Sequence, residues 1–228
     1  MKISLCLIVW NELQGCKSDL PKIPKDCFDE VFAVDGGSTD GTVEYLKKMN
    51  IPVFEQPKRG LNAAYIYANQ IAEGDAVVVF FPKATLPPED LAKFRPLLEL
   101  GNDLVVASRM IVGAVNEEDA RLLRPRKWAV LWLSVFAAVV WCRDGYRVRD
   151  VLHGVKGWTR CAFEKMQILE DGLSIDIEMV VRSYRLKLPR AEFATNEGGR
   201  EYGETNFKVW PTGKKLLKYL VFELQRRG

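Results

Sequence analysis

Residues 35–42 of the chain, DGGSTDGT, form the motif from which its fold is most directly inferred. This stretch follows a predicted strand over Glu30–Val34 and precedes a predicted helix over Val43–Met49. A carboxylate at the end of a strand can accept hydrogen bonds from a nucleobase or a ribose, as acidic residues do in dinucleotide-binding folds. The glycines allow a ligand to approach the backbone closely, and Asp40 or Thr42 can cap the helix that follows. The alternative interpretation is a well-capped turn without a ligand.

Strand and helix signals alternate on both sides of this motif. Short apolar runs predict strands, and an amphipathic stretch over Leu61–Ile71 predicts a helix between two of them. The other predicted strands of the first half are Ile3–Val9, Pro52–Glu55, Asp75–Phe81 and Asp103–Ser108. Such alternation with short links predicts a doubly wound α/β fold with a mostly parallel central sheet.

The second half of the chain shows a less regular pattern. Its predicted elements are a strand or loop over Asp150–Trp158, a strand over Pro189–Thr195, and helices over Arg160–Met166, Ser174–Leu186 and Gly213–Gln225. The last two helices are amphipathic, and the C-terminal one is basic. A helix also starts near Pro87, because proline is well suited to a first helical turn.

The composition is that of a globular protein and argues against a nucleic-acid binder. Of the 228 residues, 48% are hydrophobic and 28% charged, and the formal net charge is only +3. Basic clustering is usually much stronger in nucleic-acid-binding domains. Five cysteines without a CxxC pair and a single histidine, His153, argue against a zinc site and indicate reduced thiols in a cytoplasmic protein. The apolar start, Met1–Trp10, predicts a buried strand rather than a signal peptide.

One segment, Trp128–Cys142 (WAVLWLSVFAAVVWC), has the composition of a helix that contacts lipid. It contains no charged residue, but it is about five residues shorter than a typical membrane-spanning helix. Basic residues on both sides, together with three tryptophans, favour a helix lying in the membrane interface. The alternatives are a buried core helix, an oligomer contact or a true transmembrane span.

Several motifs together resemble a known family. DGGSTDGT is similar to the DDGSxDGT signature of family-2 glycosyltransferases with the GT-A fold. Ile8–Glu12 resembles their P-x-x-N-E strand end, without the usual Pro and Tyr, and Arg59–Ala64 resembles their Gly-rich helix start. Later motifs are similar to those of dolichyl-phosphate mannose synthases and their bacterial and archaeal relatives. These are Asp103–Arg109 (DLVVASR), Asp150–Gly154 (DVLHG), Asp176–Arg182 (DIEMVVR) and Arg200–Asn206 (REYGETN).

The resemblance implies a Rossmann-like, three-layer GT-A domain that binds a GDP- or UDP-sugar. It implies an inverting hexosyltransferase whose acceptor is a polyprenyl or dolichyl phosphate, and a soluble or protein acceptor is the alternative. Residues 1–110 would form the nucleotide-sugar-binding half and residues 111–228 the acceptor-binding half of one domain. We expect a cytoplasmic protein, peripheral on the cytosolic membrane face, with a homo-oligomer or a membrane subunit as a further partner.

The resemblance also assigns residues to the site. Asp35 would face the nucleobase and ribose, and the same pocket would be shaped by Asn11, Glu12, Ser38, Asp40, Gly60 and Asn62. Guanidinium groups suit bidentate contacts with phosphate. The diphosphate or the acceptor phosphate would therefore meet Arg109, Arg124, Arg126 and Arg200. For each arginine taken alone, the alternative is a solvated surface charge.

One departure from the family pattern concerns the metal. The family has a D-x-D motif that holds Mg²⁺ or Mn²⁺ on the donor diphosphate, whereas this chain has Phe81-Pro82-Lys83 at that point. Hard cations need oxygen ligands, so metal binding there is doubtful. In one explanation the Lys83 ammonium replaces the metal and offsets the charge of the leaving diphosphate. In another, the protein has lost turnover and is a non-catalytic nucleotide-sugar-binding protein. Misalignment, a metal site elsewhere, or a solvent-facing Lys83 are further alternatives.

The remaining candidates are acidic, aromatic and histidine side chains. Residues two apart on a helix do not share a face, so only one of Asp176 and Glu178 can point into the cleft, and we favour Asp176. A hydroxyl acceptor would need such a carboxylate as general base, whereas a phosphate acceptor is already anionic. Glu170-Asp171 is a rival pair, or a solvated loop. His153 is more readily explained as a structural side chain, and Trp158 and Trp210 as packing residues than as sugar platforms.

Overall fold

Seven strands form a single mixed sheet in the computed structural model, which describes residues 1–119, 123–170, 174–199 and 209–226, without the side chains of 209–212. The strand order is β3-β2-β1-β4-β6-β5-β7. The strands are β1 (Ile3–Val9), β2 (Glu30–Asp35), β3 (Val53–Glu55), β4 (Ala76–Phe80), β5 (Leu104–Ser108), β6 (Lys156–Thr159) and β7 (Arg190–Ala194). All described pairings are parallel except the two made by β6.

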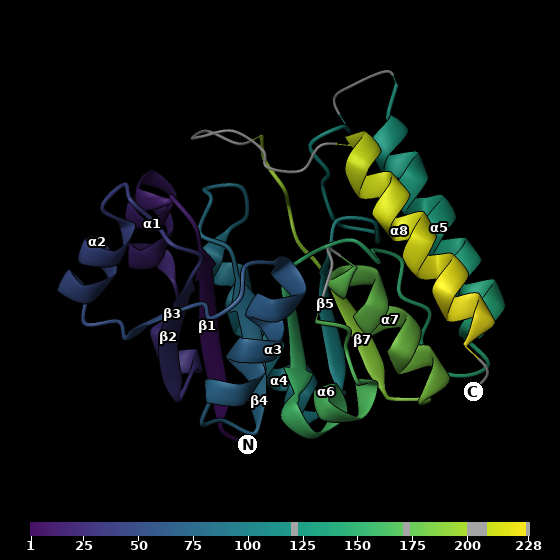
Figure 1. Ribbon diagram of the computed structural model, residues 1–228, viewed down its shortest axis with the longest axis horizontal. Helices are drawn as coiled ribbons and strands as arrows, with labels where there is room; N and C mark the ends of the chain where they lie inside the picture. Colours follow the sequence, from purple (N-terminus) through teal and green to yellow (C-terminus); the bar gives the residue numbers. More distant parts are fainter. Residues whose placement is uncertain (120–122, 171–173, 200–208, 227–228) are drawn as a thin grey trace.

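Helices connect the strands and cover both faces of the sheet. The α-helices are α1 (Leu13–Asp19), α2 (Thr42–Lys48), α3 (Leu61–Ile71), α4 (Phe94–Glu99), α5 (Pro125–Trp141), α6 (Arg160–Met166), α7 (Ile175–Arg185) and α8 (Val209–Gln225). Short 3₁₀ helices are η1 (Leu20–Lys22), η2 (Lys25–Cys27) and η3 (Pro88–Lys93). Figure 1 shows α3, α6 and α7 over the near face, with α5 and α8 side by side at the right-hand end.

Side-chain alternation along the strands separates two cores. In β1, Cys6 and Ile8 belong to the core under α3, α6 and α7, whereas Leu5 and Leu7 belong to the core under α1, α2 and α4. Successive residues of a strand point to opposite faces, so a strand buried on both faces must be apolar throughout. The fully buried sequence of β1 meets that requirement. The predicted α/β fold with a mostly parallel sheet is therefore confirmed.

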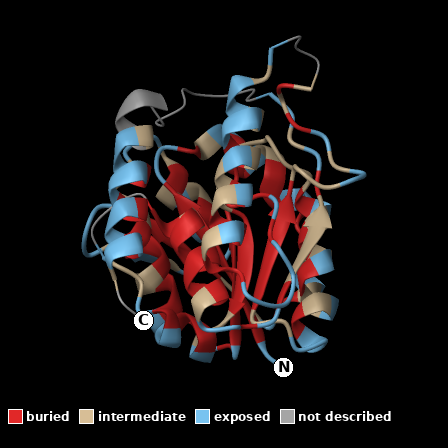
Figure 2. Cartoon of the chain, turned by 90° about the vertical axis from the view of Figure 1, so that its right-hand side faces the viewer, coloured by how far each residue is buried: buried red, intermediate tan, exposed pale blue. Residues whose placement is uncertain are grey.

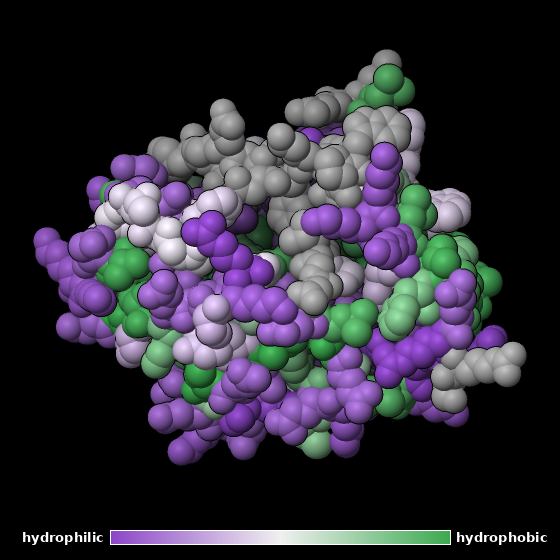
Figure 3. Space-filling view, in the orientation of Figure 1, coloured by the Kyte–Doolittle hydropathy of each residue, from purple (hydrophilic) through white to green (hydrophobic). Residues whose placement is uncertain are grey.

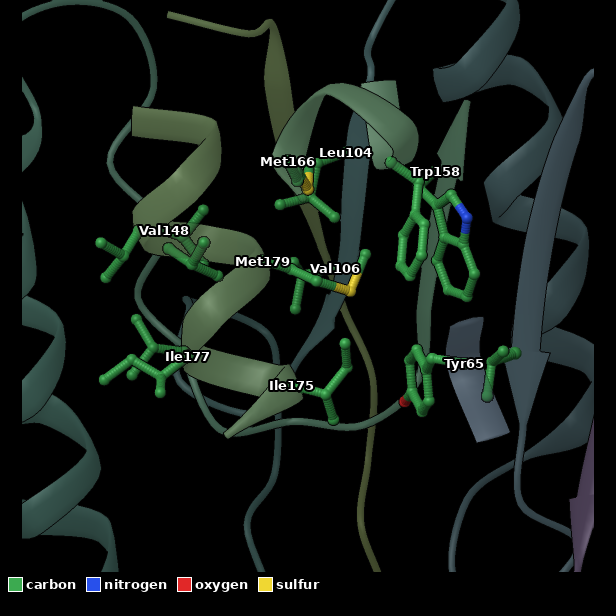
Figure 4. Close-up of a cluster of buried hydrophobic side chains, with 14 of the residues drawn as sticks. Tyr65, Leu104, Val106, Val148, Trp158, Met166, Ile175, Ile177 and Met179 are labelled. Carbon is green, nitrogen blue, oxygen red and sulfur yellow. The ribbon is translucent and has the colours of Figure 1, made fainter. Parts of the chain in front are cut away.

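The largest buried aromatic side chain is Trp158 on β6. Its ring stacks between Tyr65 and Phe163, with centroid distances of 5.3 and 5.0 Å, and its indole N–H donates to Asn69 Oδ1 at 2.9 Å. Figure 4 shows Trp158 and Tyr65 beside each other in this core. Trp158 is a packing residue, as predicted, while the side chain of Trp210 lies outside the described part of the chain.

Two elements are described more closely by the structure than by the sequence-based expectation. The stretch Asp150–Trp158 contains a loop followed by β6, a four-residue strand inserted antiparallel between β4 and β5. The helix expected from Pro87 begins as the 3₁₀ helix η3 and becomes α-helical only at Phe94. The sheet takes strands from both 1–110 and 111–228, and the assignment of one ligand to each half stays a prediction.

Helix α5 is neither fully buried nor fully exposed. Ala137 and Ala138 pack into the core, whereas Trp132, Val135 and Val139 are 61%, 63% and 69% exposed. Figure 2 shows the inner sides of the α5–α8 pair against the buried core and their outer sides open to solvent. No helix in the described ranges has the length and apolar character required to cross a bilayer.

Candidate active site

The candidate site lies at one edge of the sheet. Strands β1, β2, β3, β4, β5 and β7 run in the same direction, so their carboxyl ends meet at the upper edge in Figure 1. Strand β6 runs the opposite way and begins at this edge with Lys156. Ligands of open α/β sheets bind beyond the carboxyl ends of the strands. The predicted motifs at 8–12, 35–42, 81–83 and 103–109 all reach this edge.

The loops after β1 and β2 are locked together by hydrogen bonds. The Asn11 N–H donates to Ser38 Oγ at 2.8 Å, and the Asn11 side-chain oxygen accepts from the Thr39 N–H at 2.8 Å. The next residue, Glu12, donates its N–H to Thr42 Oγ1 at 3.0 Å. The Asp40 carboxylate accepts from the Leu13 N–H and from the Thr42 N–H at 3.0 Å each, although the N-cap position of α2 is Gly41. Asn11, Glu12, Ser38 and Asp40 thus fix the shape of this edge.

Asp35 ends β2 and is almost fully buried. Its Oδ2 accepts hydrogen bonds from the Gly37 and Ser38 N–H groups at 2.9 Å each, and its Oδ1 accepts from the Ser38 hydroxyl at 2.5 Å. The carboxylate therefore shapes the glycine loop. Two carboxylate oxygens can accept about four hydrogen bonds, so one acceptor position remains for a ligand. The predicted contact with a nucleoside stays a prediction.

Two further side chains flank this loop. Trp10 at the end of β1 is 47% exposed and packs against Gly36, where an added Cβ would lie 3.3 Å from Trp10 Cβ. Arg59 approaches Gly37, where an added Cβ would lie 3.7 Å from its Nη2. An exposed indole and a guanidinium beside a strand-end carboxylate suit a base and a phosphate. Both residues lie in motifs of the sequence analysis, Ile8–Glu12 and Arg59–Ala64, but sequence reasoning did not assign either of them to the site.

Gly60 and Asn62 differ in their burial and in their hydrogen-bond partners. Gly60 precedes α3 with φ 137°, and its carbonyl accepts from the Gln56 side chain at 2.7 Å. Asn62 is fully buried, where its amide donates to the Leu169 carbonyl at 2.8 Å and its oxygen accepts from the Ile175 N–H at 2.9 Å. The prediction that Asn62 contacts the donor does not fit this placement, because its polar atoms join α3 to the start of α7.

The Phe81-Pro82-Lys83 segment follows β4 and closely approaches α1. An added Cβ on Gly15 would lie 2.0 Å from the Pro82 carbonyl oxygen, so only glycine fits there. The Phe81 ring lies 6.3 Å from that of Tyr65, and Lys83 Nζ lies 4.9 Å from the Phe81 ring centroid. These side chains do not fit a divalent cation, since Phe81 has no ligand atom and Lys83 is itself cationic. The described residues include no cluster of three or more His, Cys, Asp or Glu side chains arranged for a metal ion.

Arg109, at the end of β5, is enclosed by carboxylates. Its Nε and Nη2 donate to the two oxygens of Asp150 at 2.8 and 3.0 Å, and its Nη1 donates to Glu197 at 2.8 Å. Burial alone would raise the pKa of Asp150, but the Arg109 guanidinium outweighs burial and lowers that pKa to about 2. Two carboxylates already balance this guanidinium, and its predicted contact with phosphate stays a prediction. Arg109 joins β5 to the loop before β6 and to the segment after β7.

Lys156, which sequence reasoning missed, is fully buried at the start of β6. Its Nζ donates to Asp176 Oδ1 at 3.0 Å and to the His153 carbonyl. The Asp176 side chain is 14% exposed, whereas Glu178 is fully buried and accepts from the Leu169 N–H at 2.9 Å. The two carboxylates thus face different surroundings, as their spacing predicted, and Asp176 is the one that reaches solvent.

His153 is a structural side chain, as we favoured. Its ring is buried with Nδ1 against the Ala107 carbonyl. Burial, reinforced by the positive charge of Arg109, lowers the pKa of His153 to about 3. The ring is therefore neutral near pH 7.

The other predicted phosphate-binding arginines lie before and at the start of α5 or outside the described residues. Arg124 pairs with Asp119 at 3.1 Å, and Arg126 pairs with Glu117 at 2.8 Å. Both side chains are more than one-third exposed, so these pairs contribute little stability. Arg200 and Asp171 lie outside the described residues.

Comparison with known proteins identifies the family. Residues 4–166 match the family model described as glycosyl transferase family 2. The chain is 31% identical over 227 residues to a dolichyl-phosphate hexose transferase of Haloferax volcanii, covering 96% of this chain and 92% of that protein. It is 25% identical over 199 residues to a low-salt glycan biosynthesis hexosyltransferase of the same organism, covering 85% of this chain and 46% of the longer relative.

A solved structure shares the fold. The glucosyl-3-phosphoglycerate synthase of Mycobacterium tuberculosis, in complex with Mn²⁺, uridine diphosphate and glucosyl-3-phosphoglycerate, superposes with a TM-score of 0.70. The match covers 100% of this chain and 81% of that chain at 18% sequence identity. At this identity the likeness shows the fold alone.

Proposed function

The chain belongs to glycosyltransferase family 2, and on that premise we propose that it transfers a hexose from a nucleoside diphosphate-sugar to a polyprenyl-type phosphate, with inversion, at a membrane surface. The acceptor class rests on one observation, which is the likeness to a dolichyl-phosphate hexose transferase along nearly the whole length of both chains. The donor class rests on the family and on the geometry of the sheet edge.

The donor nucleoside binds beside Asp35 in this proposal. Trp10 stacks on the base with its exposed indole, and the remaining acceptor position of Asp35 takes a base N–H or a ribose hydroxyl. Arg59 and Lys83 face the diphosphate from two sides of the β1 end. The hydrogen bonds of Asn11, Ser38 and Asp40 hold the loops that carry Trp10 and Asp35 in place before the donor arrives. This preorganisation reduces the entropy cost of binding.

Lys83 supplies the positive charge that a divalent cation would otherwise supply. The acceptor phosphate oxygen attacks the anomeric carbon, and the bond from that carbon to the diphosphate oxygen breaks. A fixed ammonium stabilises the negative charge that builds on the leaving diphosphate. The acceptor phosphate is already anionic, so no proton has to be removed from it. Asp176 therefore orients the reacting groups rather than acting as a general base.

The outer faces of α5 and α8 bind the membrane in this proposal. Exposed apolar side chains follow one another at helical spacing on both helices: Trp128, Trp132, Val135 and Val139 on α5, and Leu217, Val221 and Leu224 on α8. Figure 3 shows hydrophobic side chains gathered at the end of the molecule where α5 and α8 lie. Lysines of α8, such as Lys214 and Lys218, complement anionic headgroups.

Incubation of the full chain with labelled GDP- and UDP-hexoses and a polyprenyl phosphate tests the proposal. We expect labelled lipid from one donor, with the opposite anomeric configuration and with equal yield in the presence of a chelator. Label transferred only to soluble or protein acceptors would contradict the lipid acceptor.

The second candidate function is a non-catalytic nucleotide-sugar-binding protein of the same fold. The specific observation in its favour is the absence of both carboxylates at Phe81-Pro82-Lys83. Calorimetry separates the two candidates, since donor binding without transfer or hydrolysis under any condition would favour the binding protein.

A further inference from the structure

A groove of about 620 Å³ lies beside α5, outside the sheet edge described above. One wall is apolar and consists of α5 side chains, among them Leu131, Val135 and Val139. The opposite wall is the segment before β6, where Arg147 and Arg149 flank the buried Val148. Its volume is within the range of about 300–1,000 Å³ that is usual for small-molecule sites.

The two groove arginines differ from Arg109, Arg124 and Arg126. Arg109, Arg124 and Arg126 each pair with one or two carboxylates. Arg147 and Arg149 are exposed, and within the described ranges no carboxylate forms an ion pair with either of them. The nearby Glu192 carboxylate accepts from the Arg149 backbone N–H at 2.8 Å and from the Tyr146 hydroxyl at 3.1 Å rather than from either guanidinium. An apolar wall that faces two guanidinium groups without such an ion pair suits an amphiphile with an anionic head and a hydrocarbon chain.

The position of the groove links the reaction edge to the membrane-facing side. At one end it is lined by Met110, which follows Arg109 at the end of β5, and by Arg149, which directly precedes Asp150. Along its length it shares Val135 and Val139 with the exposed apolar side of α5. A chain lying in this groove could therefore continue into a bilayer while its head stays beside the reaction edge.

We propose that this groove binds the head-proximal prenyl units of the acceptor, a polyprenyl phosphate, with Arg147 and Arg149 facing its phosphate. This inference rests on the proposed function, and it adds the place and orientation of the acceptor. The apolar wall supplies affinity by burying prenyl carbons. The arginines distinguish a prenyl phosphate from a neutral prenol.

Photolabelling of the full chain with a diazirine-bearing farnesyl phosphate tests the groove without requiring turnover. We expect cross-links within residues 131–139 and 145–149, abolished by excess farnesyl phosphate. Inorganic phosphate, farnesol and phosphatidylglycerol vesicles should compete at least tenfold more weakly. Labels confined to α8, or equal competition by phosphatidylglycerol or inorganic phosphate, would overturn the assignment.

Photolabelling of variants provides a second test of the groove. Val139→Trp fills the groove from an exposed position and should reduce farnesyl phosphate labelling about tenfold. Leu100→Trp, a similar change at a position 78% exposed after α4, should leave labelling and thermal stability unchanged. The double change Arg147→Gln and Arg149→Gln should remove the preference for farnesyl phosphate over farnesol. Equal labelling of all three variants and the wild type would contradict the proposal.

The outcomes also separate this inference from the proposed function. Transfer of sugar to a polyprenyl phosphate with cross-links elsewhere would overturn the groove and leave the transferase assignment intact. Labelling of the groove without any transfer would contradict the transferase assignment and support prenyl phosphate binding by itself.

Discussion

The Lys156 ammonium is fully buried and lies 3.0 Å from Asp176 Oδ1. This ion pair, between residues 20 positions apart in the sequence, joins β6 to α7 at the candidate site. Tyr65 donates to the Gly154 carbonyl just before this strand. The pair fixes Asp176, the acidic side chain of α7 that reaches solvent.

Replacing Lys156 with methionine should destabilise the fold by about 3 kcal/mol, because removing one partner of a buried ion pair leaves the other uncompensated. The measurement is the free energy of unfolding from denaturant titration. The double variant Lys156→Met with Asp176→Leu should recover most of that loss, since an apolar pair needs no charge balance. A double variant that is as unstable as the sum of the single variants would show that the two residues do not interact.

Acid should destabilise the protein partly through His153. Its folded pKa of about 3 lies below its ordinary value of 6.5, so the unfolded chain binds a proton that the native ring does not. Stability from this group is complete above pH 6.5 and is lost as pH falls towards 3, by at most about 1.4 kcal/mol per pH unit. His153→Gln should flatten the unfolding free energy between pH 6.5 and 5 relative to wild type. An identical slope in both proteins would contradict this account.

Asp150 should contribute to the pH dependence of stability at lower pH than His153. Its pKa of about 2 lies below the ordinary 3.8, so its stabilising effect is present above pH 3.8 and is lost as pH falls towards 2. Arg109→Gln removes the partner that lowers this pKa. The variant should therefore unfold at a clearly lower temperature at pH 7, and its melting temperature should depend less on pH below 4 than that of wild type.

Trp10 should contribute to donor affinity by stacking. Trp10→Ala is expected to weaken nucleoside diphosphate binding about tenfold, equivalent to about 1.4 kcal/mol, with Trp10→Phe intermediate. Calorimetry with UDP and GDP measures the effect. Because Trp10 is half exposed, the melting temperature of the free protein should hardly change. Unaltered affinity in Trp10→Ala would place the base elsewhere.

Membrane attachment should depend on the exposed side of α5. Changing Trp132 and Val139 together to glutamine should lower partitioning into anionic vesicles by at least tenfold, because both side chains are mostly exposed and apolar. Binding of wild type should also weaken as salt rises. Leu100→Gln is the matched control. Cosedimentation that is insensitive to the double change would contradict attachment through α5.

The sequence predicted the sheet because β1, β2, β4 and β5 are continuous apolar runs that end in polar or glycine motifs. It left β6 open, as a strand or loop over Asp150–Trp158, because its four residues include a lysine and a glycine and become a strand only between two neighbours. Short strands of this kind are defined by tertiary packing rather than by local pattern.

Individual site residues were harder to predict than the edge on which they lie. Asp35, Ser38 and Asp40 belong to one local motif, and their loop role follows from it. Arg109 meets carboxylates 41 and 88 positions away, and Asn62 meets partners more than 100 positions away. A sequence motif shows which residue types lie at the sheet edge, whereas the residues that pair with them depend on the fold.

We infer that Lys83 replaces a divalent cation at the leaving diphosphate. The most direct measurement is the rate of sugar transfer by wild type and by Lys83→Gln, each with EDTA and with Mg²⁺ or Mn²⁺. We expect equal wild-type rates under all conditions and a loss of about 10²- to 10³-fold in Lys83→Gln that no metal restores. Loss of wild-type transfer in EDTA, or an unchanged rate in Lys83→Gln, would contradict it.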